Sequence, residues 1–206
     1  MLSRQKKSQI KDLRSISSTE NRGVAAGEWC AYALGKIAPE LPLNQKDNDA
    51  YSLIFDSGVL DARSITGRTI IDLRVASDQP QALIAARLDC VNTNGSIERI
   101  SYGILNLSHR ENNEKPSFLE PSKYYDISIK LKHCAYKIKT GCKLRISIST
   151  SYWLMVWPSP LTAKFMLFNG SSFTLPILTD DFTSKKVIFH KPEYAKPLSL
   201  TVKKWL

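Results

Sequence analysis

Short runs of alternating apolar and polar residues recur along this chain, and they constrain its fold more than any other feature of the sequence. In residues 71–75, 127–131 and 144–148, every second residue is aliphatic and the residues between are polar or charged. Successive side chains of a β-strand point to opposite faces, so each run gives a strand with one apolar and one polar face. Antiparallel sheets that bury a single face carry this pattern.

About eleven segments are predicted to be strands, because they alternate in this way and are rich in β-branched and aromatic residues. They are 52–55, 69–75, 82–91, 97–108, 124–131, 135–138, 143–149, 164–168, 173–176, 187–190 and 198–202. The alanines of 82–91 favour a helix, but the neighbouring segments favour a strand. No amphipathic helix separates the segments, which excludes strand–helix–strand winding and predicts an all-β fold, a two-sheet antiparallel sandwich or jelly roll.

Turn residues lie between these segments. Asn94-Gly95, Thr140-Gly141 and Asn169-Gly170 contain residues that tolerate the positive φ of tight connections. Asn94-Gly95 is the strongest indication of a hairpin, and it places 82–91 beside 97–108.

The net charge of +10 raises the hypothesis of a nucleic-acid or membrane-surface binder, but its distribution argues against that function. Residues 1–22 carry six basic and two acidic side chains, and residues 183–206 carry six basic and one acidic. The body between them is therefore nearly neutral, whereas a nucleic-acid binder pairs a basic face with stacking aromatic residues on the folded body. Nucleic acid is not an expected partner.

The length of 206 residues is enough for one self-supporting core. Residues 1–23 are polar and basic without sustained periodicity, so we expect a flexible leader there, followed by a sandwich domain over 24–206. No apolar stretch has the length of a membrane span, and no secretory signal begins the chain. We expect a soluble, cytoplasmic protein.

The four cysteines match neither a zinc module nor a disulfide framework, and buried free thiols in a reducing compartment are the favoured interpretation. Cys134 and Cys142 bracket a short turn. Whether those two pair is left open by the sequence.

Residues for catalysis or metal binding are not recognisable in the sequence. The chain has no G-x-S-x-G motif, its three histidines are dispersed, and no glycine-rich phosphate loop is present. Asp47, Asn48 and Asp49 supply too few oxygens for calcium and favour a turn or capping role. We therefore expect no catalytic residue, no metal and no cofactor.

The densest group of aromatic residues is 152–160, here named the aromatic loop. Pro158 and Pro160 exclude a central strand position for its second half. Tyr152, Trp153 and Trp157 are candidates to face a partner or a ligand, and a hydrophobic plug at the end of the sandwich is the alternative.

A series of short motifs resembles one known domain, the C-terminal jelly roll of the CocE/NonD (cocaine-esterase-like) and X-Pro dipeptidyl-peptidase hydrolases. The motifs occur in the order of that domain and span about residues 24–180. They are Ala26-Gly27-Glu28-Trp29-Cys30, Ser52-Leu53-Ile54-Phe55-Asp56-Ser57, Ser77-Asp78-Gln79-Pro80, Tyr102-Gly103-Ile104-Leu105-Asn106-Leu107-Ser108-His109-Arg110, Ala135-Tyr136, Gly141-Cys142-Lys143-Leu144-Arg145, Ser149-Thr150-Ser151-Tyr152-Trp153, Trp157-Pro158-Ser159-Pro160 and Leu175-Pro176.

The resemblance implies a galactose-binding-like sandwich that packs on an α/β-hydrolase domain and helps to wall its substrate cleft. In that family the catalytic triad belongs to the hydrolase domain, so we expect this chain to be a non-catalytic accessory domain, truncated or split from its enzyme. The parent family acts as esterases, acylases or dipeptidyl peptidases. The sequence departs from the family pattern at Asn44-Gln45-Lys46, Cys142-Lys143 and Leu154, which suggests relaxed constraint.

Three hypotheses about partners follow. The leading one has the aromatic loop facing a separately encoded hydrolase domain, with self-association as another outcome of its exposure. A stand-alone module for carbohydrate or another ligand is the alternative, with His109 and Arg110 as further ligand-facing candidates. The third is an active split hydrolase assembled from two chains.

Overall fold

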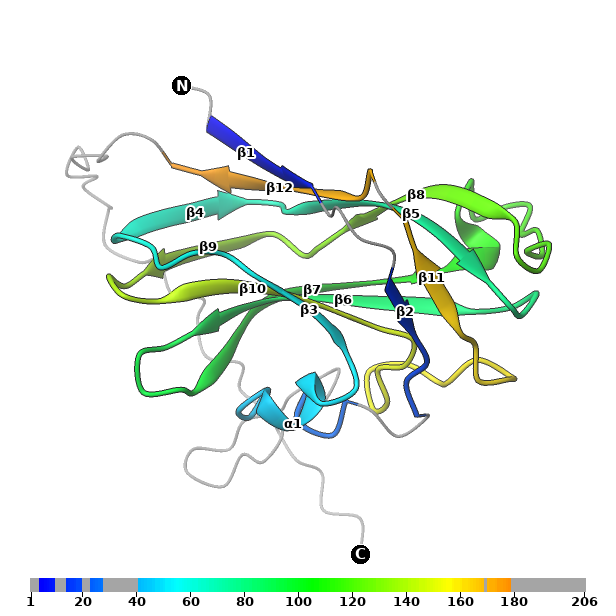
Figure 1. Cartoon of the computed structure of the whole chain (residues 1–206), viewed down its shortest axis with the longest axis horizontal. Helices are drawn as coiled ribbons and strands as arrows, with labels where there is room; N and C mark the ends of the chain where they lie inside the picture. Colours follow the sequence, from blue (N-terminus) through cyan, green and yellow to red (C-terminus); the bar gives the residue numbers. More distant parts are fainter. Residues whose placement is uncertain (1–3, 10–13, 20–22, 28–40, 169, 179–206) are drawn as a thin grey trace, which may run out of the picture.

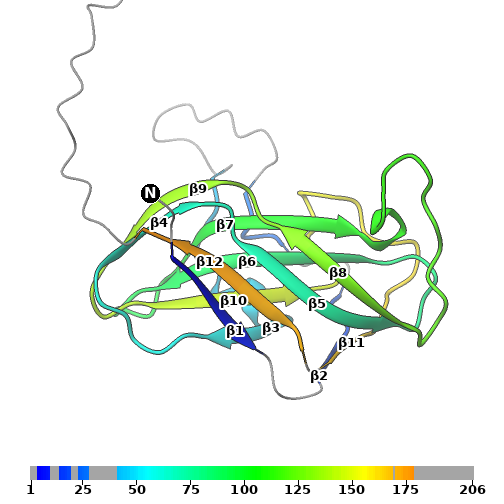
Figure 2. The same cartoon turned by 90° about the horizontal axis from the view of Figure 1, so that it is seen from above.

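Two antiparallel β-sheets packed face to face make up the computed structural model of this chain, which describes residues 4–9, 14–19, 23–27, 41–168 and 170–178 (Figure 1). The sheets form an upper and a lower layer in Figure 1, and the view from above shows the strands of the upper layer crossing obliquely over the lower ones (Figure 2). The predicted all-β sandwich is confirmed.

The larger sheet contains eight strands in the order β2-β11-β5-β12-β4-β9, with β1 paired to β12 and β8 paired to β5. The strands of this sheet are β1 (Arg4–Gln9), β2 (Arg14–Ile16), β4 (Arg63–Gly67), β5 (Ile70–Ser77), β8 (Tyr124–Lys130), β9 (Cys134–Ile138), β11 (Phe165–Leu167) and β12 (Ser172–Ile177). Its longest ladder joins β5 to β8, from the pair Ile70–Lys130 to the pair Ala76–Tyr124.

The smaller sheet has the order β3-β10-β6-β7. Its strands are β3 (Leu53–Asp56), β6 (Leu83–Val91), β7 (Ile97–Asn106) and β10 (Lys143–Ser149). The hairpin predicted at Asn94-Gly95 joins β6 to β7, and Gly95 has the positive φ of 80° expected there. The one-turn helix α1 (Lys46–Asp49) lies below this sheet in Figure 1.

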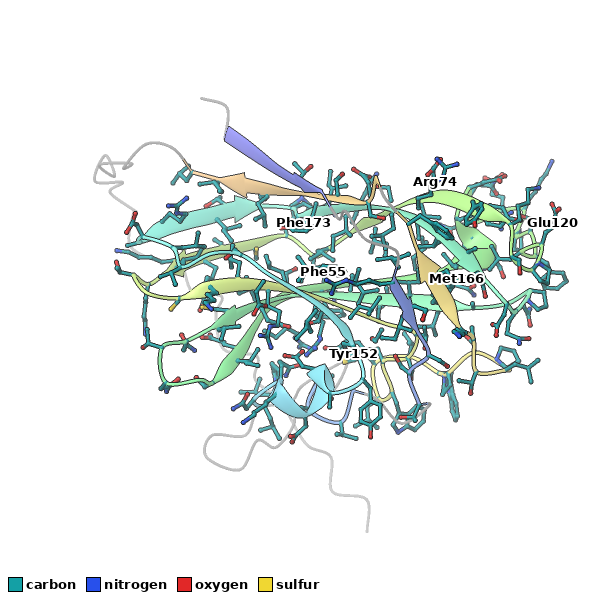
Figure 3. All side chains as sticks on the ribbon, viewed as in Figure 1. Phe55, Arg74, Glu120, Tyr152, Met166 and Phe173 are labelled. Atoms are coloured by element: carbon teal, nitrogen blue, oxygen red, sulfur yellow. The ribbon has the colours of Figure 1, made fainter. Side chains whose placement is uncertain are left out.

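The core lies between the two sheets, where the inward residues of each alternating strand meet. Ile71, Leu73 and Val75 of β5 face Leu144, Ile146 and Ile148 of β10 across this interior, and all six are buried in one cluster. Side chains fill the space between the layers in Figure 3, where Phe55 packs against the same cluster. The period-two pattern of the sequence thus becomes the inner face of each sheet.

The nine predicted strands that lie within the described residues are all present, and 187–190 and 198–202 lie outside those residues. Strand β4 escaped prediction because Ile65 is its only aliphatic residue. The segment predicted to run to Ser108 ends at Asn106, whose Oδ1 accepts a hydrogen bond from the Ser108 amide at 3.0 Å and caps the 3₁₀ turn η2 (Leu107–His109).

Within residues 1–23, where we expected a flexible leader, the structure describes residues 4–9, 14–19 and 23, and part of them forms strands. Strand β1 pairs with β12 and β2 pairs with β11, so the described part of this segment lies in the larger sheet. The Ser18 amide donates to Thr150 Oγ1 at 2.8 Å, and the Thr150 amide donates to Ser18 Oγ at 3.0 Å. Backbone hydrogen bonds hold β1 and β2 in the larger sheet. Because their sequence is polar and shows little hydrophobic periodicity, no strand was predicted there.

The cysteine question left open by the sequence is answered for three of the four residues. Cys90, Cys134 and Cys142 are free thiols, so Cys134 and Cys142 do not pair. Cys30 lies outside the described residues.

In the part of the chain that the structure describes, no helix is long and apolar enough to cross a membrane.

Candidate functional site

Strand β6 is buried on both of its faces, which marks the outer face of the smaller sheet as a covered surface. Ile84, Ala86, Leu88 and Cys90 point into the core, while Arg87 and Asp89 occupy alternate positions on the other face and are still 2% and 0% exposed. A charged side chain stays buried only with partners. Among the described residues, the cover comes from residues 23–27, from residues 41–52, which include α1, and from the aromatic loop.

Asp49 of α1 is the centre of an ionic cluster on this face. It forms a hydrogen-bonded ion pair with Arg87, accepts a hydrogen bond from Arg145 Nη1 at 2.8 Å, and accepts another from Ser147 Oγ at 3.0 Å. Arg145 also donates two hydrogen bonds to the Asp56 carboxylate, at 2.6 and 2.7 Å. The predicted turn or capping role of the 47–49 cluster is thus replaced, at Asp49, by a buried ion pair.

Gln45 extends the cluster to the chain segments that cross the sheet. Its Oε1 accepts a hydrogen bond from Arg87 Nη1 at 2.6 Å, and its Nε2 donates to the carbonyls of Ala25 and Leu43 at 2.6 Å each. Gln45 itself is fully buried. These bonds tie residues 23–27 and 41–45 to β6, so the cover is anchored through buried polar groups.

Asp89 lies deepest in the cluster. Its Oδ2 lies 3.2 Å from Ser147 Oγ and 3.8 Å from Arg87, but its Oδ1 has no hydrogen-bond partner among the described residues. Burial raises the pKa of Asp89 from 3.8 to about 7, and Arg87 offsets that rise only in part. A proton on this carboxyl therefore favours the folded state.

Tyr152, a predicted partner-facing residue, is the first residue of the aromatic loop, and its side chain points inward instead. It is 2% exposed, and Figure 3 shows it below the smaller sheet. Its hydroxyl accepts a hydrogen bond from Arg99 Nη1 at 2.7 Å, and its ring lies 5.8 Å from that of Tyr102. Burial raises the pKa of the Tyr152 phenol. Tyr152 supports the loop from within.

Of the two tryptophans of the aromatic loop, Trp157 is exposed and Trp153 is half-buried beside it. Their rings pack edge to face with centroids 5.1 Å apart, and Trp157 is 81% exposed. Leu154 between them has a φ of 74° and is half exposed, and Leu161 just beyond the loop is 59% exposed. The result is an exposed apolar ridge on a loop that is anchored from below.

Gly23 shows how tightly the anchored loop fits. Its φ is 124°, and a Cβ placed on it would lie 2.6 Å from the Trp153 carbonyl oxygen. Only glycine accommodates both the positive φ and this approach. Residues 23–27 thus pass directly under the aromatic loop.

A groove of about 420 Å³ opens between the aromatic loop and the edge of the smaller sheet. Its lining comes from residues 81–83 at the start of β6, from Ile104, Asn106 and Ser108 around the end of β7, and from residues 156–160. Most of these side chains are apolar and none is charged. Ser108 is 7% exposed, and its hydroxyl has no hydrogen-bond partner among the described residues.

His109 and Arg110, the other predicted ligand-facing candidates, do not line this groove. Arg110 Nη1 donates to the carbonyls of Leu107 and Ser117 at 3.1 and 2.7 Å, and its guanidinium lies over the Tyr125 ring at 4.5 Å. These contacts give Arg110 the role of holding the loop that follows η2. His109 is half-buried in that turn.

The buried charges of this face were missed in the sequence, although a signal for them exists. Arg87 and Asp89 interrupt the apolar run 82–91 at alternate positions, which share the face opposite to the core. An ionic residue within such a run indicates either an exposed face or a buried ion pair. The sequence does not say which, because the partner Asp49 lies about forty residues earlier.

The comparison with protein families gives a match over nearly the whole chain. Residues 2–199 match the model of the X-Pro dipeptidyl-peptidase C-terminal non-catalytic domain. No curated protein gives a significant match.

Solved structures with the same fold include three enzymes. An aminopeptidase from the marine sediment archaeon Thaumarchaeota archaeon is 14% identical over 82% of this chain and 34% of its own, with a TM-score of 0.63. An α-amino acid ester hydrolase is 14% identical over 81% and 32%, with a TM-score of 0.63. A CocE/NonD family hydrolase from Staphylococcus aureus is 12% identical over 83% and 34%, with a TM-score of 0.59. The chain thus spans about a third of the length of each.

Proposed function

This chain belongs to the family of X-Pro dipeptidyl-peptidase C-terminal non-catalytic domains, and on that premise we propose that it docks on an α/β-hydrolase domain and shapes its substrate cleft. Similar domains occupy about a third of an aminopeptidase, an amino acid ester hydrolase and a CocE/NonD family hydrolase. The remaining length of such proteins is available for a catalytic domain, which makes a hydrolase domain the natural partner.

The docking surface we propose is the ridge formed by Trp153, Leu154 and Trp157, and the exposure of Trp157 is the observation that carries the proposal. A tryptophan that is 81% exposed leaves a large apolar area in water, and buried tryptophans dominate the binding energy of many interfaces. The loop below it is anchored by Tyr152 and Met155, which are both buried. Such a preorganised ridge loses little conformational entropy on binding.

The test first searches the adjacent reading frames for an α/β-hydrolase domain with a G-x-S-x-G motif, and uses that domain as the partner. The affinity of the two parts is measured by isothermal titration calorimetry. Trp157→Ala is expected to weaken binding by at least about tenfold, the effect of losing an interface hot spot. Val59→Ala is the matched control, because Val59 is 66% exposed but lies in the turn between β3 and β4. Equal affinity of the two variants would disprove docking through the ridge.

The non-catalytic role has its own test. The isolated chain is incubated with a fluorophosphonate probe for serine hydrolases and with a p-nitrophenyl ester, and neither labelling nor turnover is expected. Stoichiometric labelling would contradict this role. Sedimentation of the isolated chain separates docking from self-association, since an exposed ridge that pairs with its own copy gives a dimer.

A further inference from the structure

We propose that the groove between the aromatic loop and the edge of the smaller sheet binds an uncharged pyranose sugar, with one face of the sugar ring stacked on Trp157. This inference concerns a ligand of the chain itself and goes beyond the docking of a hydrolase domain. The groove has a volume of about 420 Å³, which lies in the lower part of the range of small-molecule binding sites. The stacking surface, the polar side chains beside it and the absence of charge in the lining select the ligand.

Trp157 offers an open aromatic surface at the groove. The side chain lines the groove and is 81% exposed, so most of both faces of its indole is in contact with water. The edge-to-face contact with Trp153, at a centroid distance of 5.1 Å, restrains the orientation of the ring. Pro158 and Pro160 add rigid apolar surface from the same loop. The C–H groups on the face of a pyranose form an apolar surface that packs on such a ring.

Three uncharged polar side chains of the lining are available to the hydroxyl groups of a sugar, namely Gln81 at the start of β6, Asn106 at the end of β7 and Ser159 of the aromatic loop. Gln81 and Asn106 are exposed, and Ser159 is half-buried. Asn106 uses its Oδ1 to cap η2, which leaves its amide nitrogen as a donor. Within the described residues, the side chains of Gln81 and Ser159 have no hydrogen-bond partner. The Ser108 hydroxyl is enclosed by the protein and is not counted among these groups.

These three side chains match the chemistry of a sugar edge. A carboxamide both donates and accepts hydrogen bonds, and so does a hydroxyl group. A ligand that covers them has to replace the water that they lose. A pyranose carries several hydroxyls around its edge, so it can replace that water while its face stays on Trp157.

The same lining disfavours three other kinds of small ligand. No side chain of the groove is ionisable, so a uronate or a sugar phosphate would lose hydration without gaining a counter-charge. An apolar ring would cover the Gln81 amide and the Ser159 hydroxyl without replacing their hydrogen bonds to water. An open-chain polyol has no ring face for Trp157, and it loses more conformational entropy on binding. A neutral pyranose remains as the best match.

The test is a titration of the full chain, followed by amide chemical shifts, with methyl β-D-glucopyranoside and methyl β-D-galactopyranoside as probes. Shifts are expected at residues 81–83, 104–106 and 156–160 with at least one of the two glycosides. The corresponding uronide, which carries a carboxylate, should bind about tenfold more weakly. Sorbitol should give no shifts in the groove, and N-acetyl-L-phenylalaninamide should bind more weakly than the glycoside.

Variants separate stacking from hydrogen bonding. Trp157→Ala should weaken glycoside binding by at least about fivefold, whereas Trp157→Phe, which keeps an aromatic ring, should retain most of the affinity. Gln81→Ala should weaken glycoside binding by about threefold, the effect of losing one hydrogen bond.

Two of the variants also distinguish this proposal from docking of a hydrolase domain. Gln81→Ala should leave the affinity for that domain unchanged, because Gln81 lies outside the ridge. Leu154→Ala is the matched control, since Leu154 belongs to the exposed ridge but does not line the groove. This variant should bind the glycoside as the parent chain does.

Several results would overturn the proposal. They are an absence of groove shifts with both glycosides at high millimolar concentration, tighter binding of the uronide or of N-acetyl-L-phenylalaninamide, and sorbitol shifts equal to those of the glycoside. Equal glycoside binding by Trp157→Ala and the parent chain would overturn it as well, because the sugar would then not stack on Trp157.

Discussion

Replacement of Asp49 by alanine tests whether the ionic cluster holds the cover of the smaller sheet in place. Asp49 pairs with Arg87 and Arg145 and accepts a hydrogen bond from Ser147. The side chain of Arg87 is 3% exposed, so the variant leaves a buried guanidinium without its main counter-ion. Loss of one partner from a buried ion pair costs about 3–5 kcal/mol of stability.

The structure places the expected cost at the lower end of that range. Arg145 keeps both of its hydrogen bonds to Asp56, and Arg87 keeps Gln45 at 2.6 Å and Asp89 at 3.8 Å. Removal of Asp49 also removes a negative charge that helps to raise the pKa of Asp89. Asp89 can then ionise beside Arg87 and compensate in part. We expect Asp49→Ala to lower the free energy of unfolding by about 3 kcal/mol.

The assay is equilibrium unfolding in urea, followed by tryptophan fluorescence. Asp47→Ala is the matched control, because Asp47 lies on the same helical turn but is exposed, and it should change stability by no more than about 0.5 kcal/mol. The double variant Asp49→Ala with Arg87→Met should recover part of the loss, since no unpaired buried charge remains. A loss below about 1 kcal/mol for Asp49→Ala, or equal losses at positions 47 and 49, would refute a buried cluster.

Three further predictions follow from single side chains. Because the pKa of Asp89 is raised from 3.8 to about 7 in the folded chain, the stabilisation from its protonated form is complete below pH 3.8 and is lost as the pH rises to about 7. The difference in unfolding free energy between the parent chain and Asp89→Asn should therefore fall by up to about 1.4 kcal/mol per pH unit across that window. A difference independent of pH would contradict this prediction. Gly23→Ala should lower the free energy of unfolding by more than about 2 kcal/mol and alter the fluorescence of Trp153, because a Cβ at φ 124° would lie 2.6 Å from the Trp153 carbonyl oxygen. An unchanged emission spectrum and an unchanged unfolding midpoint would show that this contact is not made. Burial raises the pKa of Cys90 to about 11. Alkylation of Cys90 by iodoacetamide at pH 8 should therefore be slow in the folded chain and fast in urea. Fast alkylation of Cys90 in the native protein would place this thiol at the surface.

The strands of this protein were predictable because their signal is local. Alternation in 71–75, 127–131 and 144–148 needs only neighbouring residues to show which side chains share a face, and these runs became parts of β5, β8 and β10 with their aliphatic residues in the core. Strands β1 and β4 carry too few aliphatic residues for that signal. They join the sheet through backbone pairing with β12 and β9, which local composition does not encode.

The candidate site was predictable only in part. The aromatic loop was recognised from its tryptophans and prolines, yet its sequence does not tell that Tyr152 is buried and Trp157 is 81% exposed. That difference arises because the loop turns after Tyr152, where the amides of Met155 and Val156 donate back to the Tyr152 carbonyl at 3.1 and 3.2 Å.

By itself, the sequence determined the all-β class, the inward face of each main strand and the family resemblance, because these depend on short motifs and on a period of two residues. The tertiary structure alone decided that Arg87 and Asp89 face a cover rather than water, and that Ser108 and Trp157 line one groove. Both outcomes depend on segments far apart in the chain, such as residues 45–49 against β6 and residues 156–160 against β7. Burial is a property of what packs over a side chain, and that is known only once the chain has folded.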